Sequence, residues 1–189
     1  MYFQTEQIKL RPFEPEDVSA LKAYLNHPKL GGRRYIPGGF PEEVPLSSRQ
    51  IEGILKKWDE EKREAHLGIE LTDKHELIGH AEFKWSWDPM VPWMSVVVAR
   101  PYQRRGYGTQ VAQLIMSNLF ENTPAHSISG WMADWNKAGR SFSRKLGFKE
   151  SGRLRREGFR EGAYFDGVMV DILRTEFQAA GGMSYATRR

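Results

Sequence analysis

The sequence predicts an α/β protein in which one mixed sheet of about seven strands carries helices on both faces. Segments with the two-residue period of strands interleave along the chain with segments that have the 3.6-residue period of helices. The predicted order is β-α-α-β-β-β-α-β-α-β-β, which lacks the strict alternation of a doubly wound fold. A length of 189 residues without an internal repeat suits one domain of this kind.

The first third of the chain predicts one strand and two helices. Residues 7–11 alternate polar and apolar side chains, and the helix that follows begins with acidic residues that suit its positive end. The stretch 30–45 is rich in glycine and proline and predicts a long connection, whose part 31–39 is a candidate lid. Ser47 or Ser48 is then expected to cap a second helix.

The middle of the chain predicts strands and then a helix. Residues 67–71 and 77–87 flank the turn 72–76, which is typical of a hairpin. Residues 94–99 form a short β-branched run, which predicts a buried strand. Two glycines then lead into a helix that ends near Phe120.

The last third predicts a strand at 126–133 and a helix at 136–146 that a glycine closes. Residues 148–177 are expected to form two strands about a turn at 160–162. We therefore expect a single domain over residues 1–177 and a flexible tail over 178–189.

Composition narrows the classes of partner. The net charge of +4 comes without a continuous basic stripe, so we expect no nucleic-acid partner. The absence of cysteine excludes disulfides, thiolate metal ligands and a cysteine nucleophile, and no metal is expected. No apolar run reaches the roughly 18 residues of a membrane span, and the first residues lack the pattern of a signal peptide. We expect a cytoplasmic protein without a membrane partner.

The most informative segment is the run Arg-Pro-Tyr-Gln-Arg-Arg-Gly-Tyr-Gly-Thr at 100–109, between a β-branched strand and a helix. Backbone N–H groups at the start of a helix lack intrahelical partners, so they form an anion site. Gly106 and Gly108 allow the backbone to approach a ligand closely, and Arg104 and Arg105 add positive charge. The segment predicts a phosphate-binding loop.

The loop lacks the features of two other phosphate-binding motifs. It is not a P-loop, because no Gly-Lys-Ser/Thr follows its glycines. It is not a dinucleotide-binding fingerprint either, because Val111 follows where a third glycine is required. A simple glycine turn between strand and helix remains an alternative for the loop taken alone.

Motifs along the chain resemble the GNAT acetyltransferases. The segment 103–108 looks like the Gln/Arg-x-x-Gly-x-Gly/Ala signature of that family. Residues 136–138 and 145–148 resemble its Asn-x-x-Ser/Ala helix and its Lys-Leu-Gly-Phe ending. Residues 8–17 and 152–166 are similar to the branch that contains the ribosomal-protein alanine N-acetyltransferases. The motifs keep the family's order and cover nearly the whole chain.

The resemblance implies the GNAT fold, with a mostly antiparallel sheet that splays at its centre. It also implies acetyl-CoA as cosubstrate and transfer of its acetyl group to a primary amine of a protein N-terminus or a small molecule. An antibiotic or polyamine acetyltransferase is an alternative, as is a CoA-binding module without catalysis. Homodimerisation is left open.

In the family, the strand before the loop pairs with the pantetheine, the loop binds the pyrophosphate, and the later helix contacts the cofactor again. The cofactor-binding residues implied are Val96, Val97, Val98, Gln103, Arg104, Arg105, Gly106, Tyr107, Gly108, Thr109, Asn136 and Arg140. A helix cap is the alternative for Asn136, and a solvated cation is the alternative for Arg140.

The catalytic positions depart from the family pattern. Trp93 stands where the family often has a glutamate, and Ser143 stands where it often has a tyrosine acid. Glu82 is the first candidate for the general base, ahead of Asp134 and Asp88. Ser143 is the candidate acid. A surface carboxylate and a hydroxyl bonded to its own helix are the respective alternatives.

Three tryptophans, Trp85, Trp87 and Trp93, cluster on the expected acceptor side of the site. They either form a wall for an amine-bearing acceptor through cation–π contacts or pack the hairpin and the core.

Overall fold

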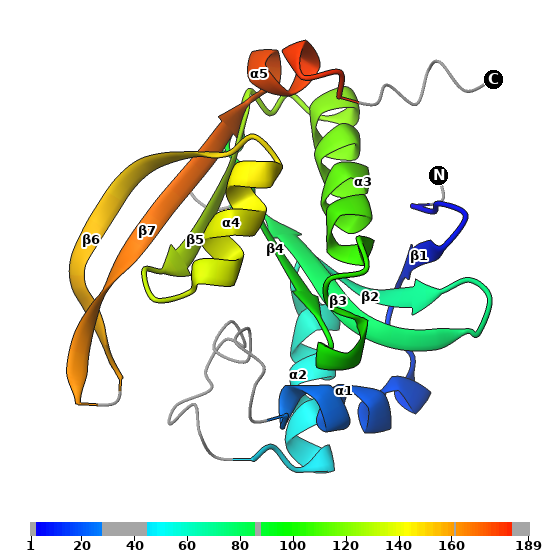
Figure 1. Cartoon of the computed structure of the whole chain (residues 1–189). Coiled ribbons are helices and arrows are strands. Elements are labelled where there is room, and N and C mark those ends of the chain that lie inside the picture. Colours follow the sequence, from blue (N-terminus) through cyan, green and yellow to red (C-terminus); the bar gives the residue numbers. More distant parts are fainter. Residues whose placement is uncertain (1–2, 28–44, 86–87, 161, 183–189) are drawn as a thin grey trace. The chain divides into compact units, whose positions relative to one another are not determined.

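A computed structural model of the chain describes residues 3–27, 45–85, 88–160 and 162–182 (Figure 1). The candidate lid 31–39, Trp87 and residues 183–189 of the predicted tail lie outside these residues. The elements in chain order are β1 (Ile8–Arg11), η1 (Pro15–Asp17), α1 (Val18–Leu25), α2 (Ser48–Glu60), β2 (Glu64–Leu71), β3 (Glu76–Lys84), β4 (Trp93–Val98), η3 (Arg100–Tyr102), α3 (Tyr107–Asn122), β5 (Ser127–Ala133), α4 (Lys137–Lys145), β6 (Lys149–Arg160), β7 (Ala163–Leu173) and α5 (Arg174–Ala179).

The seven strands form one sheet in the order β1-β2-β3-β4-β5-β7-β6. Strand β4 pairs with β5 in parallel, with Trp93 opposite Ser129. The pairs β1–β2, β5–β7 and β6–β7 are antiparallel. The predicted mixed, mostly antiparallel sheet with helices is therefore confirmed.

Three predicted boundaries are wrong. Strand β2 begins at Glu64 rather than at residue 67, and β3 ends at Lys84 rather than at 87. Residues 174–177 are helical rather than extended. The carboxylate of Glu176 accepts a hydrogen bond from the N–H of Leu173 (3.0 Å), which starts helix α5 directly after β7.

Contacts divide the chain into two compact units. The first unit comprises Met1–Phe83 and Ser95–Val111, and the second comprises Lys84–Met94 and Ala112–Arg189. The first unit holds β1 to β3, most of β4, and helices α1 and α2. The second holds most of α3 and the elements from β5 to α5.

In the first unit, helix α2 begins where a serine was expected to cap it. Ser47 Oγ accepts from the N–H of Gln50 (3.2 Å), and Gln50 Oε1 accepts from the N–H of Ser47 (2.9 Å). This reciprocal pair satisfies two donors at the helix start. Helices α1 and α2 lie side by side (Figure 1). A buried apolar cluster joins them to β3 and to the β4 end: Leu21, Tyr24, Leu25, Ile51, Leu77, Val97 and Ala99.

A buried charge network ties β1 to β2 and to the entry of α1. The guanidinium of Arg11 donates to both carboxylate oxygens of Asp17 (2.7 and 2.9 Å), and its Nε donates to Glu70. Burial raises the pKa of Asp17, but the hydrogen bonds from Arg11 and from the Glu14 N–H outweigh burial and bring that pKa below its ordinary value. The pKa of Glu70 is lowered against burial in the same way. Both carboxylates therefore stay charged within the fold.

In the second unit, β7 lies between β5 and β6. Its pairing with β6 is interrupted twice, between Glu150 and Gly152 and between Leu154 and Gly158. Across the second interruption, β6 advances four residues while β7 advances only from Gly167 to Phe165. The extra residues bulge, and Arg156 within them adopts a positive φ of 52°.

Helix α4 ends as the glycine at its C-terminus predicted. Gly147 adopts a φ of +94°, its N–H donates to Arg144 O (3.1 Å), and the N–H of Phe148 donates to Ser143 O (3.0 Å). These two bonds satisfy carbonyls that the helix itself leaves without partners. The conformation is strained for any residue with a β-carbon.

Arg174 holds the segment that follows α3 through hydrogen bonds to its carbonyl groups. Its guanidinium donates to the carbonyls of Thr123 (2.8 Å) and Ala125 (2.9 Å) and lies over the ring of Phe120. Cations near the C-terminal end of a helix are stabilising. Helix α3 is 16 residues long, and within the described ranges no helix is long and apolar enough to cross a membrane.

Replacing Arg11 with leucine should lower the free energy of unfolding by about 3 kcal/mol, because two carboxylates would stay buried without their cation. Their pKa values are lowered by folding, so the stabilisation is present above the unfolded pKa of about 4 and is lost as pH falls through the folded pKa. Urea unfolding at pH 7 and pH 3 should show a smaller loss at pH 3. Arg49→Leu, on the exposed surface of α2, is the control and should change stability by less than about 0.5 kcal/mol. Equal losses in the two variants would contradict the assignment.

Two glycine-to-alanine substitutions should change the stability of the protein in opposite directions. Gly147→Ala should destabilise the protein by about 1–2 kcal/mol, because φ is positive and a Cβ would come within 3.2 Å of Ile172 Cδ1. Gly53→Ala should stabilise it by up to about 1 kcal/mol, because nothing lies within 4 Å of the added carbon and alanine favours the helix. Thermal unfolding of both variants measures the difference. A stable Gly147→Ala protein would refute the cap.

Candidate functional site

The loop between β4 and α3 lies in the first unit. After β4 the chain makes the 3-10 turn η3, and helix α3 starts at Tyr107. The carbonyl of Gly106 accepts from the N–H groups of Thr109 (3.0 Å) and Gln110 (3.1 Å), so Gly106 is the last residue before the helix. The first N–H groups of a helix point along its axis and have no carbonyl to meet within it.

Two positive φ angles shape this loop. Arg104 has φ of 66° and Gly106 has φ of 88°. Backbone that moves in and out of the left-handed region turns successive N–H groups toward a common concavity, which is an anion-binding arrangement. Nothing lies within 4 Å of a Cβ built on Gly106, so its backbone angle, and not crowding, requires glycine. Left-handed backbone at a residue with a side chain, as at Arg104, is uncommon and clusters at functional sites.

Side chains of the loop hold it against the first unit. Gln103 Nε2 donates to the carbonyl of Val98 at the end of β4 (2.8 Å). The Arg105 guanidinium lies over the ring of Tyr102 (5.8 Å), and the Tyr102 hydroxyl donates to Glu76 of β3. This hydrogen bond raises the pKa of Tyr102. The side chain of Gln103 thus supports the loop, which leaves main-chain groups for a ligand.

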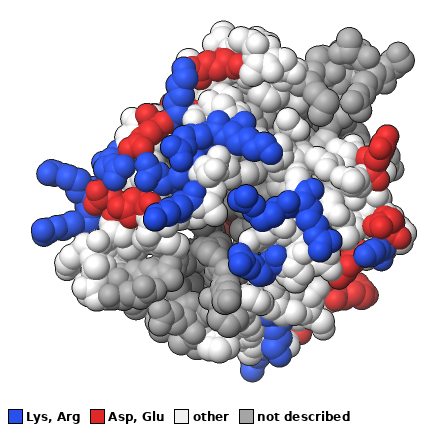
Figure 2. Space-filling model, viewed as in Figure 1, with Lys and Arg blue, Asp and Glu red and all other residues white. Residues whose placement is uncertain are grey.

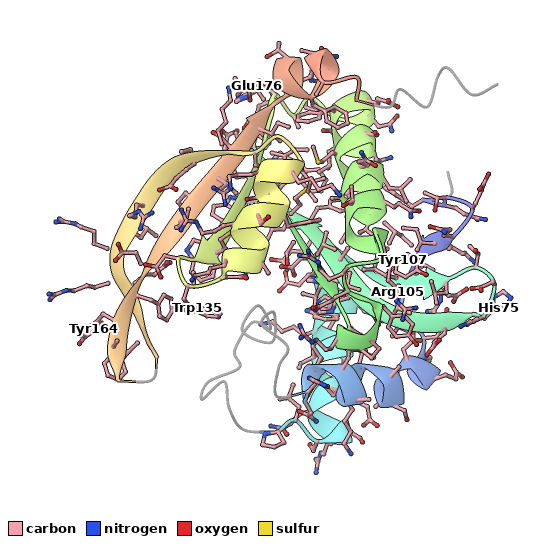
Figure 3. All side chains as sticks on the ribbon, viewed as in Figure 1. His75, Arg105, Tyr107, Trp135, Tyr164 and Glu176 are labelled. Carbon is pink, nitrogen blue, oxygen red and sulfur yellow. The ribbon has the colours of Figure 1, made fainter. Side chains whose placement is uncertain are left out.

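The loop is electropositive. Arg100, Arg104 and Arg105 are all exposed, and Figure 2 shows basic side chains over the start of α3. Arg105 and Tyr107 are labelled on this loop in Figure 3. Three cations beside outward-pointing N–H groups favour a ligand that carries phosphate.

The strand before the loop approaches β3 closely. Val97 is buried in the apolar cluster, whereas Val96 and Val98 are partly exposed. A Cβ on Gly79 would lie 2.1 Å from the carbonyl oxygen of Val97, so only glycine allows this approach. The N–H of Ala99 donates to the carbonyl of Ile78 (2.7 Å).

The candidate base Glu82 lies on β3, also in the first unit. Its side chain is 13% exposed, and its Oε2 lies 3.4 Å from Nδ1 of His66 on β2. The other ring nitrogen of His66 lies 3.0 Å from Oε2 of Glu64. Glu82 is therefore a partly buried member of a charged cluster and not a surface carboxylate.

The residues predicted on α4 lie in the second unit. Asn136 Oδ1 accepts from the N–H of Gly139 (2.9 Å), so Asn136 caps α4. A Cβ on Gly139 would come within 2.6 Å of the Asn136 amide nitrogen, so this glycine makes room for the cap. Arg140 Nη2 lies 3.7 Å from Glu150 Oε2 on the exposed side of the helix.

Ser143 bonds to its own helix. Its hydroxyl is buried and donates to the carbonyl of Arg140 (3.1 Å). A hydroxyl bonded to its own helix was the alternative to an acid at Ser143, and this hydrogen bond uses the proton that an acid would donate. Helix α4 also carries the cation of Arg144, whose Nε donates to the same carbonyl (3.2 Å).

The second-choice carboxylates also lie in the second unit. Asp88 Oδ1 accepts from the N–H of Met90 (2.7 Å), which fixes a turn. The main chain of Asp134 bonds to Asp166. Trp85 and Trp93 belong to this unit as well. A different tryptophan, Trp135, meets the ring of Phe165 edge-on (6.1 Å; labelled in Figure 3).

Sequence reasoning missed Glu64 and His66, because the predicted strand began only at residue 67. The alternation Glu-x-His directly before that strand was the available signal, since residues two apart on a strand share a face. Among the residues that the structure describes, no group of three or more His, Asp or Glu side chains is arranged to hold a metal ion. The absence of a metal remains a prediction.

Relatives and solved structures resemble the chain along most of its length. It is 26% identical to the SPbeta prophage-derived uncharacterized N-acetyltransferase YokL of Bacillus subtilis, over 96% of this chain and 98% of the relative. It is 28% identical to the uncharacterized N-acetyltransferase YnaD of the same organism, over 84% of this chain and 85% of that relative.

Solved structures share the fold. An acetyltransferase of the GNAT family from Bacillus anthracis superposes with a TM-score of 0.78 at 20% identity, over 93% of this chain and 100% of that one. The spermidine N-acetyltransferase of Vibrio cholerae, in complex with CoA and spermine, superposes with a TM-score of 0.75 at 22% identity, over 92% and 99%.

The family is decided by a sequence profile. The profile described as "Acetyltransferase (GNAT) domain" matches residues 7–149, which include β1, the loop and helix α4. The chain therefore belongs to the GNAT family and is an N-acetyltransferase that uses acetyl-CoA.

Proposed function

We propose that the pyrophosphate of acetyl-CoA binds to the main chain of residues 103–109 and that the acetyl group passes to a primary amine. The observation that carries this proposal is the pair of positive φ angles at Arg104 and Gly106 directly before a 16-residue helix. Such backbone, with exposed arginines beside it, suits a diphosphate better than a neutral ligand.

Residues of each unit are proposed to contact the pantetheine arm or the phosphates of the cofactor: Val96 to Val98 on β4 in the first, and Asn136 and Arg140 in the second. Val96 to Val98 would pair with the amides of the arm as an added strand does, and a main-chain N–H near Val98 would face the thioester oxygen. Asn136 keeps its role as helix cap and would bond the arm through its remaining amide group. Arg140 would exchange its 3.7 Å contact with Glu150 for a CoA phosphate, a small loss because the pair is exposed.

The proposed reaction is direct attack. The amine nitrogen bonds to the thioester carbonyl carbon, the carbon–sulfur bond breaks, and CoA leaves as a thiolate that takes up a proton. The amine must first lose its proton, because amines of pKa about 8 to 10 are largely protonated at neutral pH. Glu82 is proposed to accept that proton, directly or through water. Its partly buried position on β3 supports the assignment.

The acceptor is proposed to be a polyamine, another small amine or a protein N-terminus. The spermidine enzyme of Vibrio cholerae supports the first by fold alone, and the motifs shared with the ribosomal-protein branch support the last. Thiol release from acetyl-CoA, measured with spermidine, an aminoglycoside and an alanine-terminated peptide, separates these acceptors. CoA binding without release with any of them would instead support a non-catalytic module.

Gly106→Ala should weaken acetyl-CoA binding roughly 5- to 30-fold. A β-carbon at a φ of +88° costs about 1–2 kcal/mol, and relaxation to a negative φ would turn the N–H groups away from the phosphates. Isothermal titration calorimetry with acetyl-CoA measures the change. Gly53→Ala on α2 is the matched control and should bind normally; an unchanged affinity in Gly106→Ala would refute the proposed phosphate site.

Glu82→Gln should lower kcat at least about 100-fold with the best amine and leave acetyl-CoA affinity unchanged, because a carboxamide cannot accept the proton. Steady-state thiol release measures kcat, and calorimetry measures affinity. Glu60→Gln, exposed at the end of α2, makes the same substitution away from the cluster and should retain full activity. A fully active Glu82→Gln enzyme would exclude this glutamate as the base.

A further inference from the structure

We propose that His66 is a doubly protonated imidazolium, held between Glu64 and Glu82, that positions Glu82 and keeps its carboxylate charged. The inference rests on the proposed function in one respect, since it takes Glu82 as the base. His66 itself is a positioning residue, because it would act only through Glu82.

The three side chains form a line across two neighbouring strands of the first unit. On β2, Glu64 Oε2 lies 3.0 Å from His66 Nε2; across to β3, His66 Nδ1 lies 3.4 Å from Glu82 Oε2. The side-chain exposures are 24% for Glu64, 2% for His66 and 13% for Glu82. A nearly buried ring therefore joins two carboxylates that each still reach solvent.

The number of protons on the ring follows from its two neighbours. A neutral imidazole carries one N–H and one acceptor nitrogen, whereas ionised carboxylates only accept. With a carboxylate at each nitrogen, a neutral ring would set a lone pair against one of them. Both contacts become attractive only when both nitrogens of His66 are protonated. The Nε2 contact has the geometry of a hydrogen bond, whereas the Nδ1 contact is an ion-pair distance. Charge on the ring strengthens both.

The surroundings of the ring favour its charge. The indole of Trp58 on α2 stacks on His66 with ring centroids 4.5 Å apart and an angle of 3° between the planes. An aromatic face at this distance attracts a cation, more strongly where water is excluded. A carboxylate on either side compensates the cost of placing the cation in a buried position.

The other titratable groups near the ring are held neutral. His80 on β3 is fully buried, and its Nδ1 lies 2.8 Å from the hydroxyl of Tyr24 on α1. Burial, and then the charge of His66, lowers the pKa of His80 to about 3. Burial raises the pKa of Tyr24 above its ordinary value. Within the part of the chain that the structure describes, the acidic groups placed against the two ring nitrogens of His66 are Glu64 and Glu82.

This arrangement would give the reaction an oriented base. Without a cation beside it, a partly buried carboxylate tends to take up a proton and would be unable to accept one from the amine. Because Oε2 of Glu82 lies against Nδ1 of His66, the other carboxylate oxygen, Oε1, would be the one that accepts the proton. Glu64 would hold the far side of the ring and keep its second proton in place.

The first experiment needs no acceptor. Side-chain ¹⁵N NMR of the full chain, labelled at histidine, reports whether each ring nitrogen of His66 is protonated between pH 6 and 8. We expect two protonated nitrogens at pH 7 in the unaltered protein, and loss of one of them in Glu64→Gln and in Glu82→Gln. A singly protonated His66 at pH 7 in the unaltered protein would overturn the inference, whatever the activity of the enzyme.

The second experiment is the pH dependence of kcat/KM with the best amine. In His66→Asn and in Glu64→Gln, the acidic limb of the profile should move to higher pH by about one unit, because an opposite charge at this distance favours the ionised carboxylate. His75→Asn is the matched control, since His75 also lies near a glutamate, Glu70, but is exposed at the β2–β3 turn (Figure 3). It should leave the limb in place.

The outcomes separate the two proposals. A shifted limb together with a doubly protonated ring supports the positioning role. An unmoved limb in both His66→Asn and Glu64→Gln, while Glu82→Gln is inactive, overturns the role of His66 and leaves the base intact. A fully active Glu82→Gln enzyme rejects the base and, with it, this inference. Glu64→Gln, at the most exposed of the three positions, keeps the test decisive if His66→Asn does not fold.

Discussion

The need to pair charges that are buried against the sheet organises the first unit. A lone ion in such a place is costly, so each buried charge has a partner of opposite sign. Arg11 joins two carboxylates from η1 and β2, and in doing so it fixes where the chain leaves β1. At the start of β2, His66 lies between Glu64 of the same strand and Glu82 of β3. One cluster stabilises the unit, and the other contains Glu82, the proposed base.

Side-chain contacts hold the loop between β4 and α3, the proposed phosphate site, in a defined conformation. Gln103 fastens it to Val98, and the Arg105–Tyr102 contact together with the Tyr102–Glu76 hydrogen bond supports it from β3. A loop held in this way loses little conformational freedom when a ligand arrives, so more of the binding energy remains as affinity. The left-handed angle at a non-glycine residue is part of the same conformation, because the supporting contacts hold it there.

Most of the fold could be predicted from the sequence, because local chemistry determines where its helices begin and end. The binding of the cofactor to the loop 103–109 stays a prediction. Gly147 ends its helix through a left-handed backbone angle, and Ser47 caps the start of its helix. Both effects are local and do not depend on where the helices lie in the fold. The charged cluster could not be predicted, since its members come from two strands and a helix whose register no local pattern encodes. The candidate base Glu82 was chosen from its position on the hairpin strand alone. The hydrogen bond of the Ser143 hydroxyl could not be predicted, because it depends on a rotamer that the residue type does not determine. The end of β7 was misjudged because Glu176, three residues on, starts a helix.

The two interruptions in the β6–β7 pairing have a consequence for the outer border of the sheet, where β6 is the last strand. A regular border strand presents a row of unpaired backbone groups on which another chain can add itself. Here the bulges break that row, and the same stretch is rich in charged side chains, with Arg153 paired to Glu150 and Asp166. An incoming strand would find neither a continuous register nor a neutral surface. The irregular β6 is thus a poor template for the pairing of a further strand at this edge.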